Sequence, residues 1–152
     1  MCLFLILSAL PVAADDKPVI VAFGDSLSAG YGLDEADSFP VRLQAALLAG
    51  GIDAEVVNSG VSGDTTAGGL ARLEWSLPDH VDLVILELGA NDGLRGIDPT
   101  ETEANLDAIL KTLGSRDIPV LFTGMLAPPN LGREYAAAFD ALAFLAEPAN
   151  KV

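Results

Sequence analysis

The sequence has 152 residues, which suits a single domain, and 51% of them are hydrophobic, which is enough to build a core. Its 22 acidic residues outnumber the 8 basic residues and give a formal net charge of -14 at pH 7. This charge argues against nucleic acid as a partner and against an electrostatic hold on anionic lipid, because both kinds of binding depend on Lys and Arg.

The first residues resemble the later part of a secretory signal. Residues 3–10 form a short apolar run, and the small residues at 12–14 precede Asp15 as a signal peptidase requires. The run is too short to span a bilayer. We therefore expect residues 1–14 to be a signal remnant, residues 15–152 to form one domain, and the protein to be periplasmic or secreted without a stable membrane anchor.

Apolar runs and helical patterns alternate along the rest of the chain. In chain order, we expect a strand at 19–23, a helix at 39–48, a strand at 54–57, a helix at 65–77, a strand at 81–88, a helix at 99–113, a strand at 120–123 and a helix at 130–145. The strand runs show little polar alternation, which is typical of strands buried on both faces. In the third helix, Leu106, Ile109, Leu110 and Leu113 form an apolar stripe. This alternation predicts one α/β domain with a parallel sheet, helices on both faces and right-handed crossovers.

In such a sheet, ligands bind beyond the carboxyl ends of the strands. The segments that follow the four strands are GDSLSAG, NSGVSGDT, GANDGLRG and GMLAPPNLG. All four are rich in Gly, Asn, Ser or Pro. We expect them to be loops that share one edge of the sheet and carry the function.

The first three of these segments could build an acyl-transfer site. Ser26 can be the nucleophile, although a helix cap or a turn is the commoner role of a single serine. The backbone N–H of Ser26, the N–H of Gly63 and the side-chain amide of Asn91 can donate hydrogen bonds to the oxyanion that develops. A nucleotide site is weakly supported, because no segment has P-loop or GxGxxG spacing, and the GxSxG elbow of α/β-hydrolases is also absent.

Three longer blocks, GDSLSAGYGL, NSGVSGDTTAGGLARL and LELGANDGLRG, resemble the blocks of the SGNH hydrolases, also called the GDSL esterase/lipase family. GDTTAGGLARL, NDGLRG and PPNLG are similar to the subgroup of periplasmic multifunctional thioesterases, lysophospholipases and arylesterases. The resemblance implies a three-layer α/β/α, flavodoxin-like parallel sheet. It also implies hydrolysis of small-molecule fatty acyl thioesters, lysophospholipids or aryl esters through an acyl-enzyme on Ser26, with Gly63 and Asn91 completing the oxyanion hole.

Four acidic residues lie close to these positions. For Asp25, Asp64 and Asp92 we favour a structural role, in which the carboxylates bond loop N–H groups and hold the edge of the sheet rigid. We expect Glu87 to be hydrogen-bonded in the core and to have no catalytic role.

Four apolar residues of the last two segments could line an acyl pocket, because such pockets are mostly apolar. They are Leu94, Leu126, Pro128 and Pro129. Ordinary loop packing is the alternative explanation for them.

The resemblance lacks one part, the C-terminal Asp-x-x-His block that supplies the base, together with the last strand and helix of the fold. His80 is the single histidine, and we expect it near the opposite edge of the sheet, roughly 25 Å from Asn91. With Cys2 as the single cysteine, no Cys/His metal site of the usual spacing can form, and we expect no metal and no cofactor. We therefore expect a truncated hydrolase with impaired activity. The alternatives are a non-catalytic acyl-binding pseudoenzyme, a carbohydrate acetylesterase and, more distantly, a flavodoxin-like nucleotide binder.

Overall fold

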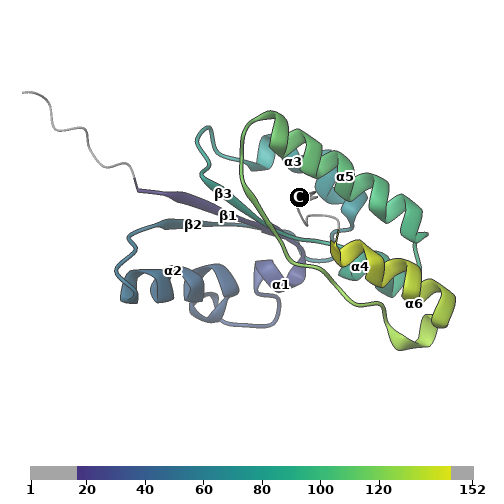
Figure 1. Cartoon of the computed structure of the whole chain (residues 1–152). Coiled ribbons are helices and arrows are strands. Elements are labelled where there is room, and N and C mark those ends of the chain that lie inside the picture. The colour runs from purple at the N-terminus through teal and green to yellow at the C-terminus, as the bar shows by residue number, and fades with distance from the viewer. Residues whose placement is uncertain (1–16, 145–152) are drawn as a thin grey trace, which may run out of the picture.

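The structure is a computed structural model that describes residues 17–144 (Figure 1). The expected signal remnant at 1–14 lies outside the described residues. The strands are β1 (Val19–Gly24), β2 (Glu55–Gly60), β3 (Leu83–Glu87) and β4 (Val120–Phe122). The α-helices are α1 (Ser26–Ala29), α2 (Phe39–Ala49), α3 (Thr66–Ser76), α4 (Ala90–Arg95), α5 (Pro99–Ser115) and α6 (Arg133–Asp140), and single 3-10 turns occupy Glu35–Asp37, Pro129–Leu131 and Ala141–Phe144.

All neighbouring strands pair in parallel, in the order β2-β1-β3-β4. Helices α1 and α2 lie on one side of the sheet, and α3 and α5 lie on the other (Figure 1). The predicted parallel α/β architecture is therefore confirmed. In the register of the sheet, Gly24 of β1 pairs with Gly60 of β2 and with Glu87 of β3, so these three strands end at one level.

The strand order decides which strands are buried. β1 and β3 are central, and Val21, Phe23, Val84 and Leu86 are fully buried in them. The expectation that all four strands are buried on both faces is wrong for β2 and β4, which are the outer strands of the sheet among the described residues; Leu121 of β4, for example, is 54% exposed. The core between the sheet and the α3–α5 layer is built by Val21, Phe23, Leu73, Val84, Leu86, Leu88, Leu106, Ile109, Leu113 and Ile118.

Three of the four segments expected to be loops contain strand or α-helix, and the fourth contains the 3-10 turn Pro129–Leu131. Residues 58–60 continue β2 because they pair with β1. Residues 26–29 form α1 and residues 90–95 form α4, two helices too short for an apolar period to reveal them in the sequence. The last expected helix, at 130–145, is shorter than predicted: α6 begins only at Arg133, and a 3-10 turn follows it. None of the helices among residues 17–144 is long and apolar enough to span a membrane.

Helix α1 lies directly against the strand ends because two glycines allow it. A Cβ atom on Gly24 would collide with the Ser28 hydroxyl and the Glu87 carboxylate. A Cβ atom on Gly60 would collide with the backbone of Ala29. This contact fixes α1, and with it Ser26, at the edge of the sheet.

Arg72 of α3 ties the helix layer to the same edge. Its side chain is only 7% exposed, and its Nε lies 2.7 Å from Oδ2 of Asp64. Its two Nη atoms donate to the carbonyls of Ser59 and Gly24, each at 2.9 Å, and the guanidinium stacks 4.0 Å from the centre of the Phe23 ring. One buried cation therefore satisfies the ends of two strands and the carboxylate of the loop that follows β2.

We predict that Arg72→Met lowers the free energy of unfolding by about 3–5 kcal/mol, because it leaves the Asp64 carboxylate buried without its partner. Chemical denaturation followed by circular dichroism measures the loss. Arg42→Met is the matched control: its 4.0 Å pair with Asp37 is exposed, so the loss should not exceed about 1 kcal/mol. Equal losses for both variants would contradict the role assigned to Arg72.

Candidate active site

Asn91 brings the three predicted site residues together. Its Nδ2 donates to Oδ2 of Asp25 and to the backbone carbonyl of Asp64, each at 2.9 Å. Asp25 immediately precedes Ser26, and Asp64 immediately follows Gly63. The segments after β1, β2 and β3 therefore meet at the carboxyl edge of the sheet, as expected.

Ser26 is the first residue of α1. Asp25 caps this helix by accepting the Leu27 N–H at 3.0 Å, and Gly30 ends it in a left-handed conformation with φ of 81°. N–H groups in the first turn of a helix have no partner within it. Among the described residues, neither the N–H nor the hydroxyl of the half-buried Ser26 takes part in a hydrogen bond, so both are available to a ligand.

Gly63 is exposed and has φ of 82°, in the left-handed region that favours glycine. Its carbonyl accepts a 2.8 Å hydrogen bond from Nη2 of Arg95, which anchors this loop to α4. Within residues 17–144, its N–H donates no hydrogen bond. The loop is thus held from one side while the amide stays free.

Asn91 differs from the expectation in two ways. It lies in α4 rather than in a loop at the strand end, because the chain turns at Gly89 (φ 118°) and becomes helical at once. Both amide protons are already donated, one to Asp25 and one to Asp64. Asn91 can therefore donate to an oxyanion only by sharing or releasing one of these bonds, whereas the N–H groups of Ser26 and Gly63 are free.

The neighbouring aspartates make structural contacts. Asp25 is fully buried and divides its two oxygens between the α1 cap and Asn91. Asp92 is also fully buried, and its carboxylate accepts the N–H and the hydroxyl of Thr66 at the start of α3. Asp64 differs from the expectation, since its carboxylate pairs with Arg72 rather than with a loop N–H.

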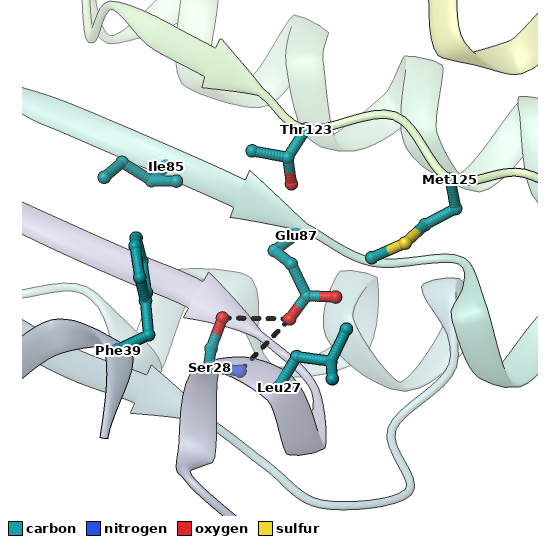
Figure 2. Close-up of a pocket in the computed structure, with 7 residues that line it drawn as sticks. All are labelled: Leu27, Ser28, Phe39, Ile85, Glu87, Thr123 and Met125. Carbon is teal, nitrogen blue, oxygen red and sulfur yellow. Dashed lines mark hydrogen bonds between the residues drawn. The ribbon is translucent and has the colours of Figure 1, made fainter. Parts of the chain in front are cut away.

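Glu87, at the end of β3, is hydrogen-bonded in the core as predicted. Its Oε2 accepts hydrogen bonds from the Asp25 N–H and, as Figure 2 shows, from the Ser28 N–H and the Ser28 hydroxyl. Burial, and then the nearby charge of Asp25, raise the pKa of the Glu87 carboxyl from 4.5 to about 7. Its Oε1 is buried and has no hydrogen-bond partner among the described residues. The sequence contains a second serine in GDSLS and a glutamate in LELG, but only the structure shows that these two residues meet.

A cavity of about 310 Å³ lies beside this carboxyl (Figure 2). Most of its lining is apolar, and the residues that form it are Leu27, Ser28, Phe39, Ile85, Glu87, Thr123 and Met125. None of the residues predicted to contact the acyl chain is among them. Leu94 and Leu126 are 71% and 79% exposed, and Pro128 packs against Gly93 of α4. Their role in substrate binding stays a prediction.

His80 lies at the other edge of the sheet. Its Nε2 is 3.1 Å from Oδ2 of Asp82, and the same oxygen accepts the N–H of Val19, the first residue of β1. Ser26 lies two residues beyond the last residue of β1, at the opposite end of that strand, so the described part of the chain brings no histidine to the proposed nucleophile. Residues 17–144 also contain no group of His, Cys, Asp and Glu side chains that could hold a metal ion.

Comparison with known proteins agrees with this geometry. Residues 22–148 match the model of the GDSL-like lipase/acylhydrolase family. The chain is 42% identical over 140 residues to the arylesterase of Vibrio mimicus, covering 91% of this chain and 68% of that protein. It is 40% identical over 141 residues to thioesterase 1/protease 1/lysophospholipase L1 of Escherichia coli strain K12, covering 92% and 65%.

Among solved structures, AlinE4, an SGNH-hydrolase family esterase, is 52% identical with a TM-score of 0.81, and the match covers 86% of this chain and 70% of that one. The family match extends over most of the sequence, and it includes the three segments that meet at one edge of the sheet. The chain therefore belongs to the GDSL-like lipase/acylhydrolase family of ester-bond hydrolases.

Proposed function

We propose that this chain hydrolyses esters and thioesters of small molecules through an acyl-enzyme on Ser26. The observation that carries the proposal is the position of Asn91, bonded on one side to the neighbour of Ser26 and on the other to the neighbour of Gly63. The Ser26 hydroxyl makes no hydrogen bond among the described residues, and Asn91 joins its segment to the one that carries Gly63, which supports a site for acyl transfer.

In the proposed reaction, the Ser26 hydroxyl loses its proton to a base and its oxygen bonds to the acyl carbon. The carbonyl oxygen becomes an oxyanion that accepts hydrogen bonds from the N–H groups of Ser26 and Gly63. The Asn91 amide contributes by turning one proton away from Asp25 or Asp64. When this intermediate collapses, the bond to the leaving oxygen or sulfur breaks, the base returns the proton to it, and the acyl group stays on Ser26. A water molecule then loses a proton to the base and attacks the acyl carbon, the bond to Ser26 breaks, and the acid is released as the proton returns to the Ser26 oxygen.

The relatives support the substrate class: their names specify an arylesterase, the esterase TesA, and a thioesterase that is also a lysophospholipase. We propose aryl esters, fatty acyl thioesters and lysophospholipids for this chain. Leu94 and Leu126, which are both largely exposed, are proposed to contact the acyl chain together with Pro128. The proposed location is periplasmic or extracellular, on the evidence of residues 1–14, and residues 15–152 are proposed to form the catalytic domain.

The identity of the catalytic base, which must accept the Ser26 proton, makes a second function a candidate: binding of acyl compounds without hydrolysis. No histidine among residues 17–144 reaches Ser26, and a site that keeps only its oxyanion donors gives ~10³–10⁴-fold catalysis over water. This observation favours slow hydrolysis by the chain alone, or an acyl-binding protein that has kept the pocket without turnover. A base added from solution distinguishes the two functions.

We predict that imidazole, added as an external base, accelerates the hydrolysis of p-nitrophenyl esters by the chain, and that Ser26→Ala abolishes this protein-dependent part. Release of p-nitrophenol is measured with and without protein, which subtracts the reaction of imidazole itself. Ser115→Ala, on the exposed end of α5, is the matched control and should keep the wild-type rate. An equal rate in Ser26→Ala would contradict the nucleophile, and ester binding without any acceleration would favour the acyl-binding protein.

We predict that Asn91→Ala lowers the imidazole-supported kcat by about 10²–10³-fold with little change in KM, because the lost donor acts mainly on the oxyanion. Stopped-flow assays over a range of ester concentrations separate the two constants. Thermal melting of the same sample is needed, because Asn91 also joins Asp25 to Asp64. A folded variant with wild-type kcat would show that the two backbone N–H groups suffice.

A further inference from the structure

We propose that Glu87 is a positioning residue for the reaction, one that holds the turn carrying Ser26 from inside the fold. The inference rests on the proposed function of Ser26 as nucleophile. Glu87 makes no hydrogen bond to Ser26 itself, so it acts through the residues on either side of the nucleophile.

A single carboxylate oxygen of Glu87 accepts hydrogen bonds from both ends of the turn formed by residues 25–28. Oε2 accepts the N–H of Asp25 at 3.2 Å, the N–H of Ser28 at 3.3 Å and the hydroxyl of Ser28 at 2.9 Å (Figure 2 draws the two bonds from Ser28). Asp25 is the residue before Ser26, and Ser28 is the second residue after it. The backbone position of Ser26 is thereby fixed relative to the end of β3.

The same contact reaches the other donors of the site. Asp25, whose N–H is held by Glu87, binds Asn91 through its own carboxylate. Asn91 in turn binds the carbonyl next to Gly63. A loosened Glu87 contact would therefore disturb the nucleophile and the amide of Asn91 together, rather than one of them alone.

The charge of Glu87 determines the strength of the three hydrogen bonds that its Oε2 accepts. A carboxylate accepts hydrogen bonds about twice as strong as those to a neutral acceptor. Oε1 has no donor among the described residues, so a proton added to Glu87 would reside there and leave Oε2 a neutral, weaker acceptor. Because burial raises the pKa of this carboxyl to about 7, the change falls in the range where esterases are assayed.

Few other charges bear on Glu87. Asp25 faces it from the end of β1 and contributes to the raised pKa. Neither α1, with the sequence SLSA, nor β4, with the sequence VLF, contains an ionisable residue. The remaining residues around the cavity, among them Phe39 of α2 and Thr123 and Met125 after β4, are uncharged.

As pH rises, the hydrogen bonds accepted by Glu87 should become stronger, while the contribution of Glu87 to the stability of the fold should become smaller. The folded pKa of Glu87 lies above its unfolded value, so the fold binds more protons than the unfolded chain between pH 4.5 and about 7. The contribution of Glu87 to stability is therefore greatest below pH 4.5 and falls as pH rises to 7. Over the same interval the carboxylate forms and tightens the turn.

The experiment compares wild type with Glu87→Gln, which keeps the shape and an acceptor oxygen but never carries a charge. The rate of Ser26 modification by a fluorophosphonate is measured at a fixed imidazole concentration, from pH about 5 to pH about 9, on either side of the Glu87 pKa. The rate of wild type is divided by the rate of Glu87→Gln at each pH, because the titration of imidazole affects both rates equally and cancels in this ratio. We expect this ratio to rise roughly three- to tenfold through pH 7, since three hydrogen bonds gain a charged acceptor.

Two further variants complete the test. Glu103→Gln, on the exposed side of α5, is the control for a change of net charge and should give a ratio that does not vary with pH. Ser28→Ala removes the shortest of the three bonds and should lower the rate above pH 7 more than below it. This variant keeps the proposal open to contradiction if Glu87→Gln does not fold.

The outcomes separate the two proposals. A ratio for Glu87→Gln that stays flat, with Ser26 labelled in both proteins, overturns the positioning role and leaves the nucleophile intact. A purely structural carboxylate would give that flat ratio while wild type still loses thermal stability relative to the variant between pH 4.5 and 7. Failure of wild type to be labelled at Ser26 at any pH overturns the proposed function and this inference with it.

Discussion

The two hydrogen bonds donated by the side-chain amide of Asn91 are the interaction on which the site depends. Three chain segments leave the sheet at the same level, because Gly24, Gly60 and Glu87 are aligned in register. Register alone would leave their ends near one another but unattached. Asn91 connects them, since it lies between the aspartate before Ser26 and the aspartate after Gly63. The reversal of strand order between β1 and β3 places this junction where open α/β sheets bind their ligands.

Much of this could be predicted from the sequence, for identifiable reasons. The long apolar runs and the apolar stripe on α5 indicate the order of the strands and helices. In a parallel sheet, the GDS, SGDT and GAND segments must then share one edge. Strand order could not be read in this way, so the exposure of β2 and β4 was missed. Helices α1 and α4 were also missed, because four and six residues are too few to display a helical period. The contact between Glu87 and Ser28 depends on the register of β1 and β3, which are distant in sequence, because α1 follows β1 directly. Neither residue alone indicates this contact.

The buried and half-buried acids of this edge have different partners and therefore different effects. Asp92 is matched by the N–H and hydroxyl at the start of α3, and Asp64 is matched by Arg72, so both join helices to the sheet. Within residues 17–144, Glu87 has donors on one oxygen only. A carboxyl that is buried and half satisfied costs stability when it ionises, and natural proteins accept such costs mainly where function requires them. Its place beneath the Ser26 turn fits that pattern.

The close contact of α1 with the strand ends limits how the sequence can drift. A methyl group at position 60 would meet the backbone of Ala29, and one at position 24 would meet the Ser28 hydroxyl and the Glu87 carboxylate. Either methyl group would push α1 outward and move Ser26 away from the N–H of Gly63 and the side-chain amide of Asn91. Glycine is required at these two positions because no side chain fits there, and not because of any need for flexibility, so even alanine should be disfavoured at either position.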